Sequence, residues 1–182
     1  MTDLTSMREA PSVEQEAPNF RDVFDREAGY VWNTLRRLGV RHDDLKDQSQ
    51  EVFLTVHHLL PDFDIGRPMR PWLFAIAYRI AARYRVRSAR QPSAASTDQV
   101  DLGRRPDEEL ADKEAQALVL EAMEAIEFTR RPVFLLAEID QVPIPEIAHA
   151  LSIPLNTAYS RLRIAREEFA SASRALQRRE RV

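Results

Sequence analysis

The sequence contains no cysteine and only 4 glycines in 182 residues. Without cysteine, the chain can form no disulfide, no thiolate metal site and no cysteine nucleophile. The phosphate-binding patterns G-x-G-x-x-G and G-x-x-x-x-G-K-[ST] do not occur, nor does the nucleophile pattern G-x-S-x-G. These absences remove most of the support for the common catalytic scaffolds.

Long apolar runs are also missing from the chain. No stretch approaches the roughly 20 residues that a membrane-spanning helix requires. The N-terminus lacks the basic and apolar regions of a signal peptide. We therefore expect a soluble, cytoplasmic protein with no membrane insertion.

The net charge is −3, but the charges are distributed unevenly. The stretch "RIAARYRVRSAR", residues 79–90, holds five arginines and no acid. On a helix, four of them would lie along one side: Arg79, Arg83, Arg87 and Arg90. Such a stripe can follow the phosphates of a nucleic acid, and the alternative is a solvated helix face.

Hydrophobic spacing predicts an all-α fold of two small helical domains joined by a flexible linker. Residues 1–18 are expected to be a disordered lead-in and residues 19–90 a domain of three helices. The glycine that ends the first helix is Gly39, and Asp43 or Asp44 is the expected cap of the second. The linker is expected at 91–111 and the second domain at 112–182, where Thr129 can cap one helix.

The second domain contains the segment "PIPEIAHALSIPLNTAYSRLRIARE", residues 143–167. Pro145 suits the first turn of a short helix, and Pro154 ends it. A second helix follows, capped by Asn156 or Thr157. Its polar side chains match a recognition helix that reads DNA, although a helical hairpin with a solvated polar face fits this segment equally well.

Three segments resemble motifs of bacterial RNA polymerase sigma factors of the extracytoplasmic-function (ECF) class. They are "DLKDQSQEVFLTVHHLLPDF", "RPWLFAIAYRIA" and "TRRPVFLLAEIDQVPIPEIAHALSIPLNTAYSRLRIAR". They occur in the order typical of that family, and the resemblance spans residues 20–90 and 112–170. It implies a promoter-specificity subunit that is not an enzyme and needs no cofactor or metal. Its implied partners are the clamp and flap of core RNA polymerase, and promoter DNA in duplex and single-stranded form.

The resemblance also implies three sets of site residues. The N-terminal domain would bind the polymerase clamp through Asp44, Asp47, Gln50 and Glu51. The −10 element would contact Phe63, Arg67, Met69, Trp72, Arg79, Arg83 and Arg87. The C-terminal domain would contact the −35 element through Asn156, Thr157, Tyr159, Ser160, Arg161 and Arg163. Two of these interpretations have alternatives: the acids can be a solubilising face, and Trp72 can be a core residue.

The sequence departs from the family pattern at several positions. Lys46 replaces a glutamate of the docking helix, and a positive charge there would weaken docking on a basic clamp. Phosphorylation of Ser49 or Thr55 by a regulatory kinase would restore negative charge, and an anti-sigma factor is a second possible regulator. Tyr159 and Ile164 replace two cations, so the −35 preference should differ from the commonest one.

Three other functions compete with the sigma-factor interpretation. A free-standing helix-turn-helix regulator would read duplex DNA unaided, which usually requires a dimer. A metal-dependent hydrolase would use the histidines His42, His57 and His58 with Asp44 or Glu51. An adaptor would only sequester a partner. Because no H-E-x-x-H pattern is present, we expect these histidines to be surface or core residues. The adaptor differs from a sigma factor in that it would not open DNA.

Overall fold

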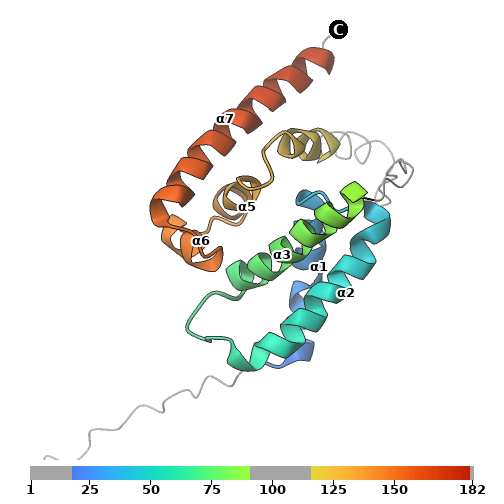
Figure 1. Ribbon diagram of the computed structural model, residues 1–182, viewed down its shortest axis with the longest axis vertical. Coiled ribbons are helices and arrows are strands. Elements are labelled where there is room, and N and C mark those ends of the chain that lie inside the picture. Colours follow the sequence, from blue (N-terminus) through green and yellow to red (C-terminus); the bar gives the residue numbers. More distant parts are fainter. Residues whose placement is uncertain (1–17, 91–115, 181–182) are drawn as a thin grey trace, which may run out of the picture.

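The structure is a computed structural model that describes residues 18–90 and 116–180. Across these ranges the chain forms helices and turns and no strand, which confirms the all-α prediction (Figure 1). The expectations for residues 1–17 and for the linker 91–111 lie outside the described residues.

Three helices form the N-terminal part: α1 (Phe20–Arg37), α2 (His42–Leu59) and α3 (Met69–Arg90), with a short 3-10 turn, η1 (Leu60–Asp62), after α2. Asn19 caps α1 by accepting the Arg21 N–H at 2.9 Å. Gly39 follows the end of α1 with φ +87°, as a helix C-terminus requires. The predicted cap of α2 is wrong: its N-cap residue is Arg41, and the acids proposed as caps lie in the first turn, where they complement the helix dipole.

The C-terminal part begins with a helical segment at 116–124. It continues through α5 (Arg131–Phe134), a π-helical turn η2 (Leu135–Ile139), α6 (Ile144–Ala150) and α7 (Leu155–Glu180). Thr129 does not cap α5, because Arg130 is the N-cap and the Thr129 hydroxyl donates to the Glu127 carboxylate at 2.6 Å. Asn156 and Thr157 are not caps either, since α7 already begins at Leu155.

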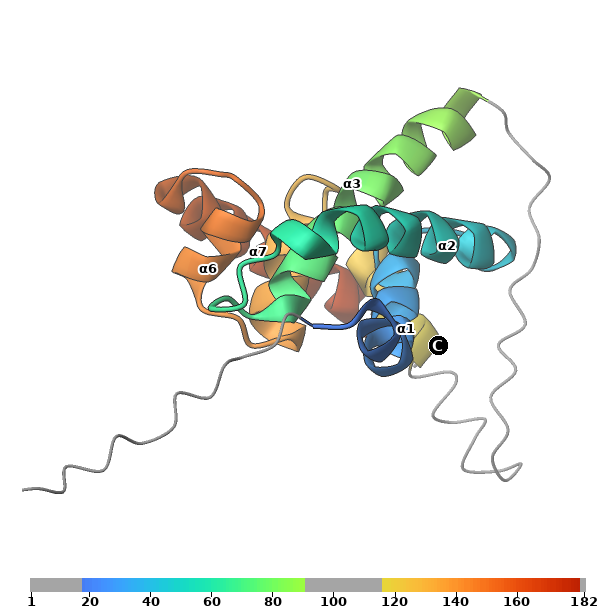
Figure 2. The same cartoon turned by 90° about the horizontal axis from the view of Figure 1, so that it is seen from below.

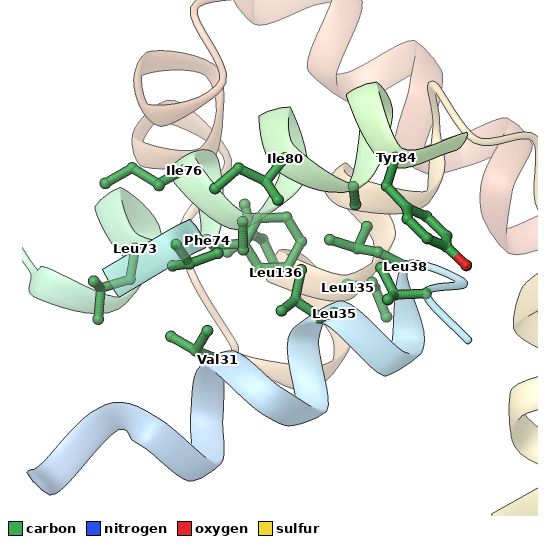
Figure 3. Close-up of a cluster of buried hydrophobic side chains, with 14 of the residues drawn as sticks. Val31, Leu35, Leu38, Leu73, Phe74, Ile76, Ile80, Tyr84, Leu135 and Leu136 are labelled. Atoms are coloured by element: carbon green, nitrogen blue, oxygen red, sulfur yellow. The ribbon is translucent and has the colours of Figure 1, made fainter. Parts of the chain in front are cut away.

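The two parts share one hydrophobic core. Leu135 and Leu136 of η2 are at most 1% exposed and lie between α1 and α3 (Figure 3). They lie among the buried side chains Leu35, Leu38, Phe74 and Ile80. Because these residues are apolar and fully buried, the hydrophobic effect holds the two parts together.

Arg131 and Gly39 form a second close contact between the parts. Arg131 is 3% exposed, and its Nη2 donates to the carbonyls of Glu124 at 2.9 Å and Ile126 at 3.1 Å. Burial and the neighbouring Arg85 lower the pKa of the Arg131 guanidinium. A Cβ at Gly39 would lie 3.2 Å from Arg131 Nη1, so a glycine suits both the backbone conformation and the close approach.

The substitution Gly39→Ala should lower the free energy of unfolding by about 1 kcal/mol or more, because alanine is strained at positive φ. The matched control is Gly29→Ala, in the middle of α1, where an added Cβ meets nothing within 4 Å. That control should raise the free energy of unfolding by about 0.5–1 kcal/mol. Denaturant titration measures both, and equal effects of the two substitutions would contradict the prediction.

Candidate nucleic-acid interface

A cleft lies where the two parts of the molecule meet. Its first wall runs from η1 to the middle of α3 and includes Phe63, Arg67, Trp72 and Arg79. Its second wall is α6 and the turn that follows, which lie beside that segment (Figure 2). The cleft therefore brings together four of the seven residues predicted for the −10 element.

The aromatic residues of the cleft are half-buried. The rings of Phe63 and Trp72 lie 4.8 Å apart at an angle of 49°. Both side chains, and that of Met69, also pack against the core. Trp72 packs against the core and also lines the cleft, so its role at the −10 element stays a prediction.

The loop before α3 is ordered by Asp64. Its Oδ1 accepts the Gly66 N–H at 3.0 Å, and its Oδ2 accepts Arg67 Nε at 3.0 Å. Both members of the Arg67 pair are exposed, and such surface pairs contribute little to stability. Arg67 can consequently exchange its carboxylate partner for a phosphate at small cost.

The predicted arginine stripe of α3 divides between two environments. Arg79 lines the cleft, whereas Arg83 and Arg87 lie beside α2. Arg83 Nη2 donates to Glu51 Oε1 at 2.8 Å, and Arg87 Nη2 donates to Gln48 Oε1 at 3.5 Å. Both arginines remain largely exposed, so their guanidinium groups are accessible from solvent.

The residues predicted to dock on polymerase also divide into two pairs. Asp44 accepts the Tyr84 hydroxyl at 2.7 Å and Glu51 accepts Arg83, so both face α3. Burial, together with the bond to Asp44, raises the pKa of Tyr84. Asp47 and Gln50 are instead exposed on the outward side of α2.

An apolar groove lies between α1 and α2. It is lined by Phe20, Phe24, Ala28, Trp32, Lys46, Ser49, Gln50, Phe53, Leu54 and His57. The Ser49 hydroxyl is buried and has no hydrogen-bond partner within the described part of the chain. The Thr55 hydroxyl donates to the Glu51 carbonyl at 2.9 Å. Phosphorylation of Ser49 or Thr55 stays a prediction, and at Ser49 it requires the hydroxyl to become accessible.

The polar side chains of α7 lie mainly on an exposed face. Asn156, Tyr159, Ser160 and Arg163 are exposed, and Arg163 Nη1 pairs with Glu167 at 2.7 Å. Ser160 donates to the Thr157 carbonyl at 3.0 Å. Thr157 and Arg161 are half-buried, and Arg161 lies near Tyr78 of α3, whose pKa burial raises.

The turn between α6 and α7 has well-defined backbone geometry. Ser152 has φ +54°, and its N–H donates to the His149 carbonyl at 3.0 Å. The Ile153 N–H donates to the Ala148 carbonyl at 2.9 Å, as in a Schellman helix end. Since α6 has 7 residues and α7 has 26, the pair is a short helix followed by a long one, as in a helix-turn-helix.

Sequence reasoning missed a hydrogen bond that joins the two parts. The Tyr30 hydroxyl of α1 donates to Asp140 Oδ2 at 2.6 Å, across 110 residues of sequence. Arg70 lies 5.1 Å from the centre of the Tyr30 ring, and its Nε pairs with Glu27 at 3.0 Å. Burial is the main cause that raises the pKa of both Tyr30 and Asp140. No local pattern signals this contact, because only the tertiary fold brings the residues together.

The histidines that a metal-dependent hydrolase would use do not form a metal site. His57 packs edge-on against Phe20, with ring centres 4.9 Å apart, and His58 Nδ1 lies 2.9 Å from the Leu54 carbonyl. No group of three or more potential ligands among His, Cys, Asp and Glu occurs in the described residues. Over the same ranges, no helix has the length and apolar character needed to cross a membrane.

Comparison with known proteins supports the resemblance seen in the sequence. Residues 23–91 match the family model "Sigma-70 region 2". The ECF RNA polymerase sigma-E factor of Escherichia coli is 26% identical over 147 residues, which are 75% of this chain and 77% of that protein. The RNA polymerase sigma factor CnrH of Cupriavidus metallidurans is 27% identical over 162 residues, 84% of this chain and 85% of its own length.

Two solved structures share the fold. CnrH in complex with the cytosolic domain of CnrY matches with a TM-score of 0.60 and 23% identity, over 86% of this chain and 88% of that one. The sigma factor RpoE of Bartonella quintana, solved with the anti-sigma factor NepR, matches with a TM-score of 0.64 and 16% identity, over 84% of this chain and 95% of that one.

These matches define the class of protein as a transcription initiation factor of the sigma type, which is not an enzyme. Residues 23–91 match sigma-70 region 2, and the chain is similar to ECF sigma factors of RNA polymerase over most of its length.

The substitution Asp140→Asn should change how stability depends on pH. Because the pKa of Asp140 is raised in the folded protein, its stabilising contribution is present at low pH and is lost as pH rises through the folded value. The variant should therefore lose less stability than the parent between about pH 4 and pH 7. Urea unfolding at several pH values measures this, with the exposed Asp25→Asn as control. A parent and variant with parallel pH profiles would contradict the prediction.

Proposed function

We propose that this sigma factor recognises promoters through two surfaces, the cleft beside α3 for the −10 element and the exposed face of α7 for the −35 element. The observation that carries the proposal is the Phe63 and Trp72 ring pair, flanked by Arg67 and Arg79. It lies inside the segment that matches the sigma family model. Aromatic rings with adjacent guanidinium groups suit unstacked bases and their phosphates.

The −10 surface would act on single-stranded DNA. Extruding a base costs a few kcal/mol, and stacking on an aromatic side chain returns about 1–3 kcal/mol per base. Phe63 and Trp72 would provide the stacking surface, while Arg67 and Arg79 would bind the neighbouring phosphates. Met69 supports the loop from the core side, and Arg83 and Arg87 would contact the backbone farther along α3.

The −35 surface would act on duplex DNA. Asn156, Tyr159 and Ser160 lie in the first two turns of α7, the part of a recognition helix that reaches base edges in the major groove. Arg163 would bind a phosphate, after exchanging its partner Glu167 on the exposed surface. Thr157 and Arg161 are half-buried, and we assign them to the edge of this surface.

Docking on polymerase would use the outward side of α2. Asp47 and Gln50 are exposed there, and Leu54, which is 57% exposed, adds an apolar contact. Asp44 and Glu51 would act mainly by holding α2 against α3. Lys46 lies beside Asp47 and reduces the negative charge of this side.

The two surfaces correspond to the domains that we propose for the chain, residues 19–90 and 112–182. Core RNA polymerase and promoter DNA are the proposed partners, which places the protein in the cytoplasm. An inhibitor of the anti-sigma type is a further proposed partner, because the similar RpoE was solved with an anti-sigma factor.

The proposal is tested by transcription with purified bacterial core polymerase and a library of fragments from the source genome. Sequencing of initiated transcripts should reveal discrete start sites that require the protein and share two spaced upstream elements. Polymerase binding without initiation would point to a missing modification or activator on the docking helix. Tight duplex binding by the protein alone, without polymerase binding, would overturn the proposal in favour of a free-standing regulator.

The substitution Asp47→Lys should weaken polymerase binding about tenfold, because it places a second cation on the docking side of α2. The loss should shrink at high salt, as expected for a screened surface interaction. Titration of labelled protein against core polymerase measures the affinity. The control Asp25→Lys makes the same charge change at an exposed position of α1 and should leave the affinity within about twofold. Equal losses in both variants would indicate a general charge effect and contradict this docking surface.

A further inference from the structure

Tyr159 is an aromatic residue in the second turn of α7 that is 53% exposed. Within residues 18–90 and 116–180, its hydroxyl makes no hydrogen bond. The side chain lines a groove together with Pro143 and Ile144, at the start of α6. A ring that is held beside a second helix loses little conformational freedom when it binds a partner. Tyr159 is therefore well suited to a contact outside the chain.

Tyr159 shares one face of α7 with three other exposed side chains. They are Asn156, Ser160 and Arg163, and the four residues follow the helical spacing i, i+3, i+4, i+7. Asn156 and Tyr159 are three residues apart, which is about 4.5 Å along the helix axis. Successive base pairs of DNA are separated by about 3.4 Å. These two side chains can therefore reach neighbouring base pairs.

The start of α7 offers few donors for guanine. Guanine is read mainly by arginine or lysine, which donate to its O6 and N7 atoms. Residues 155–160 contain neither arginine nor lysine. Arg161 is half-buried, and Arg163 pairs with Glu167 at 2.7 Å and is assigned to a phosphate. This part of the helix consequently favours A·T pairs over G·C pairs.

An asparagine and an aromatic ring match the two bases of A·T pairs. The asparagine amide can donate to N7 of adenine and accept from its N6 amino group. Thymine presents a methyl group in the major groove, and apolar side-chain surface contacts that group. We propose that Tyr159 determines −35 specificity by packing its ring against the methyl group of a thymine, next to an adenine that Asn156 reads. The inference rests on the proposed function.

The first test removes the methyl group from the DNA and leaves the protein unchanged. Promoters found by the transcription experiment are synthesised with deoxyuridine in place of each thymine of the −35 element, one at a time. Deoxyuridine pairs as thymine does and lacks only the methyl group. At one position the affinity of the protein–polymerase complex for the promoter should fall about fourfold, as expected for the loss of one buried methyl-sized group.

Variants at position 159 assign this loss to the aromatic ring. Tyr159→Ala should bind the thymine and deoxyuridine promoters equally, because the contact is already absent. Tyr159→Phe keeps the ring and should keep the fourfold difference. The matched control is Val119→Ala, which truncates another exposed apolar side chain of the C-terminal part and should also keep it. Thermal unfolding of each variant checks that the protein is folded.

The second test changes the base that is preferred. In Tyr159→Lys, an ammonium group replaces the ring and can donate to O6 and N7 of guanine. The start-site experiment repeated with this variant should change one position of the −35 element from an A·T pair to a G·C pair. The −10 element should stay the same, because it contacts a different surface.

The outcomes separate this inference from the function on which it rests. If the parent protein directs no initiation, the proposed function fails and the inference fails with it. If the parent initiates but no deoxyuridine substitution weakens binding, Tyr159 contacts no thymine methyl group and only the inference is overturned. The same holds if Tyr159→Ala keeps the fourfold difference, or if the −35 elements lack two neighbouring A·T pairs.

Discussion

The insertion of Leu135 and Leu136 between α1 and α3 is the interaction on which the rest of the structure depends. These two side chains come from the C-terminal part, yet they complete the core of the N-terminal one. Their burial fixes the direction of the chain that follows, since the π-helical turn ends at Ile139 and only a short loop separates it from α6. The position of the helix-turn-helix against the cleft therefore follows from an apolar contact some distance from it.

The same contact explains why polar residues of the two parts meet. Tyr30 reaches Asp140, and Arg131 packs over Gly39, only because the apolar side chains bring α1 and η2 together. A hydrogen bond that excludes water is stronger than an exposed one, but it is also lost when the surrounding apolar contact opens. The interface therefore behaves as one unit. Apolar burial holds the two parts together, and the polar pairs fix how the parts are aligned.

Much of the local structure could be predicted because short-range signals determine it. Gly39 adopts the positive φ expected of a helix end, and Pro145 lies in the first turn of α6. The predicted caps failed at Asp43, Asp44 and Thr129 because capping depends on backbone geometry at one residue, which spacing does not define. The arginines predicted to form one stripe lie on α3 in two environments, because Arg79 lines the cleft whereas Arg83 bonds to Glu51 of α2.

The sequence by itself determined the helices, their apolar faces and the family, because periodicity, turn residues and motif order are local properties of the chain. Only the tertiary structure decided which polar groups face each other. The Tyr30–Asp140 pair, separated by 110 residues, and the closing of the cleft by α6 have no local signature. Contacts of this kind depend on how whole helices pack, and packing is decided by the shape of the complete core.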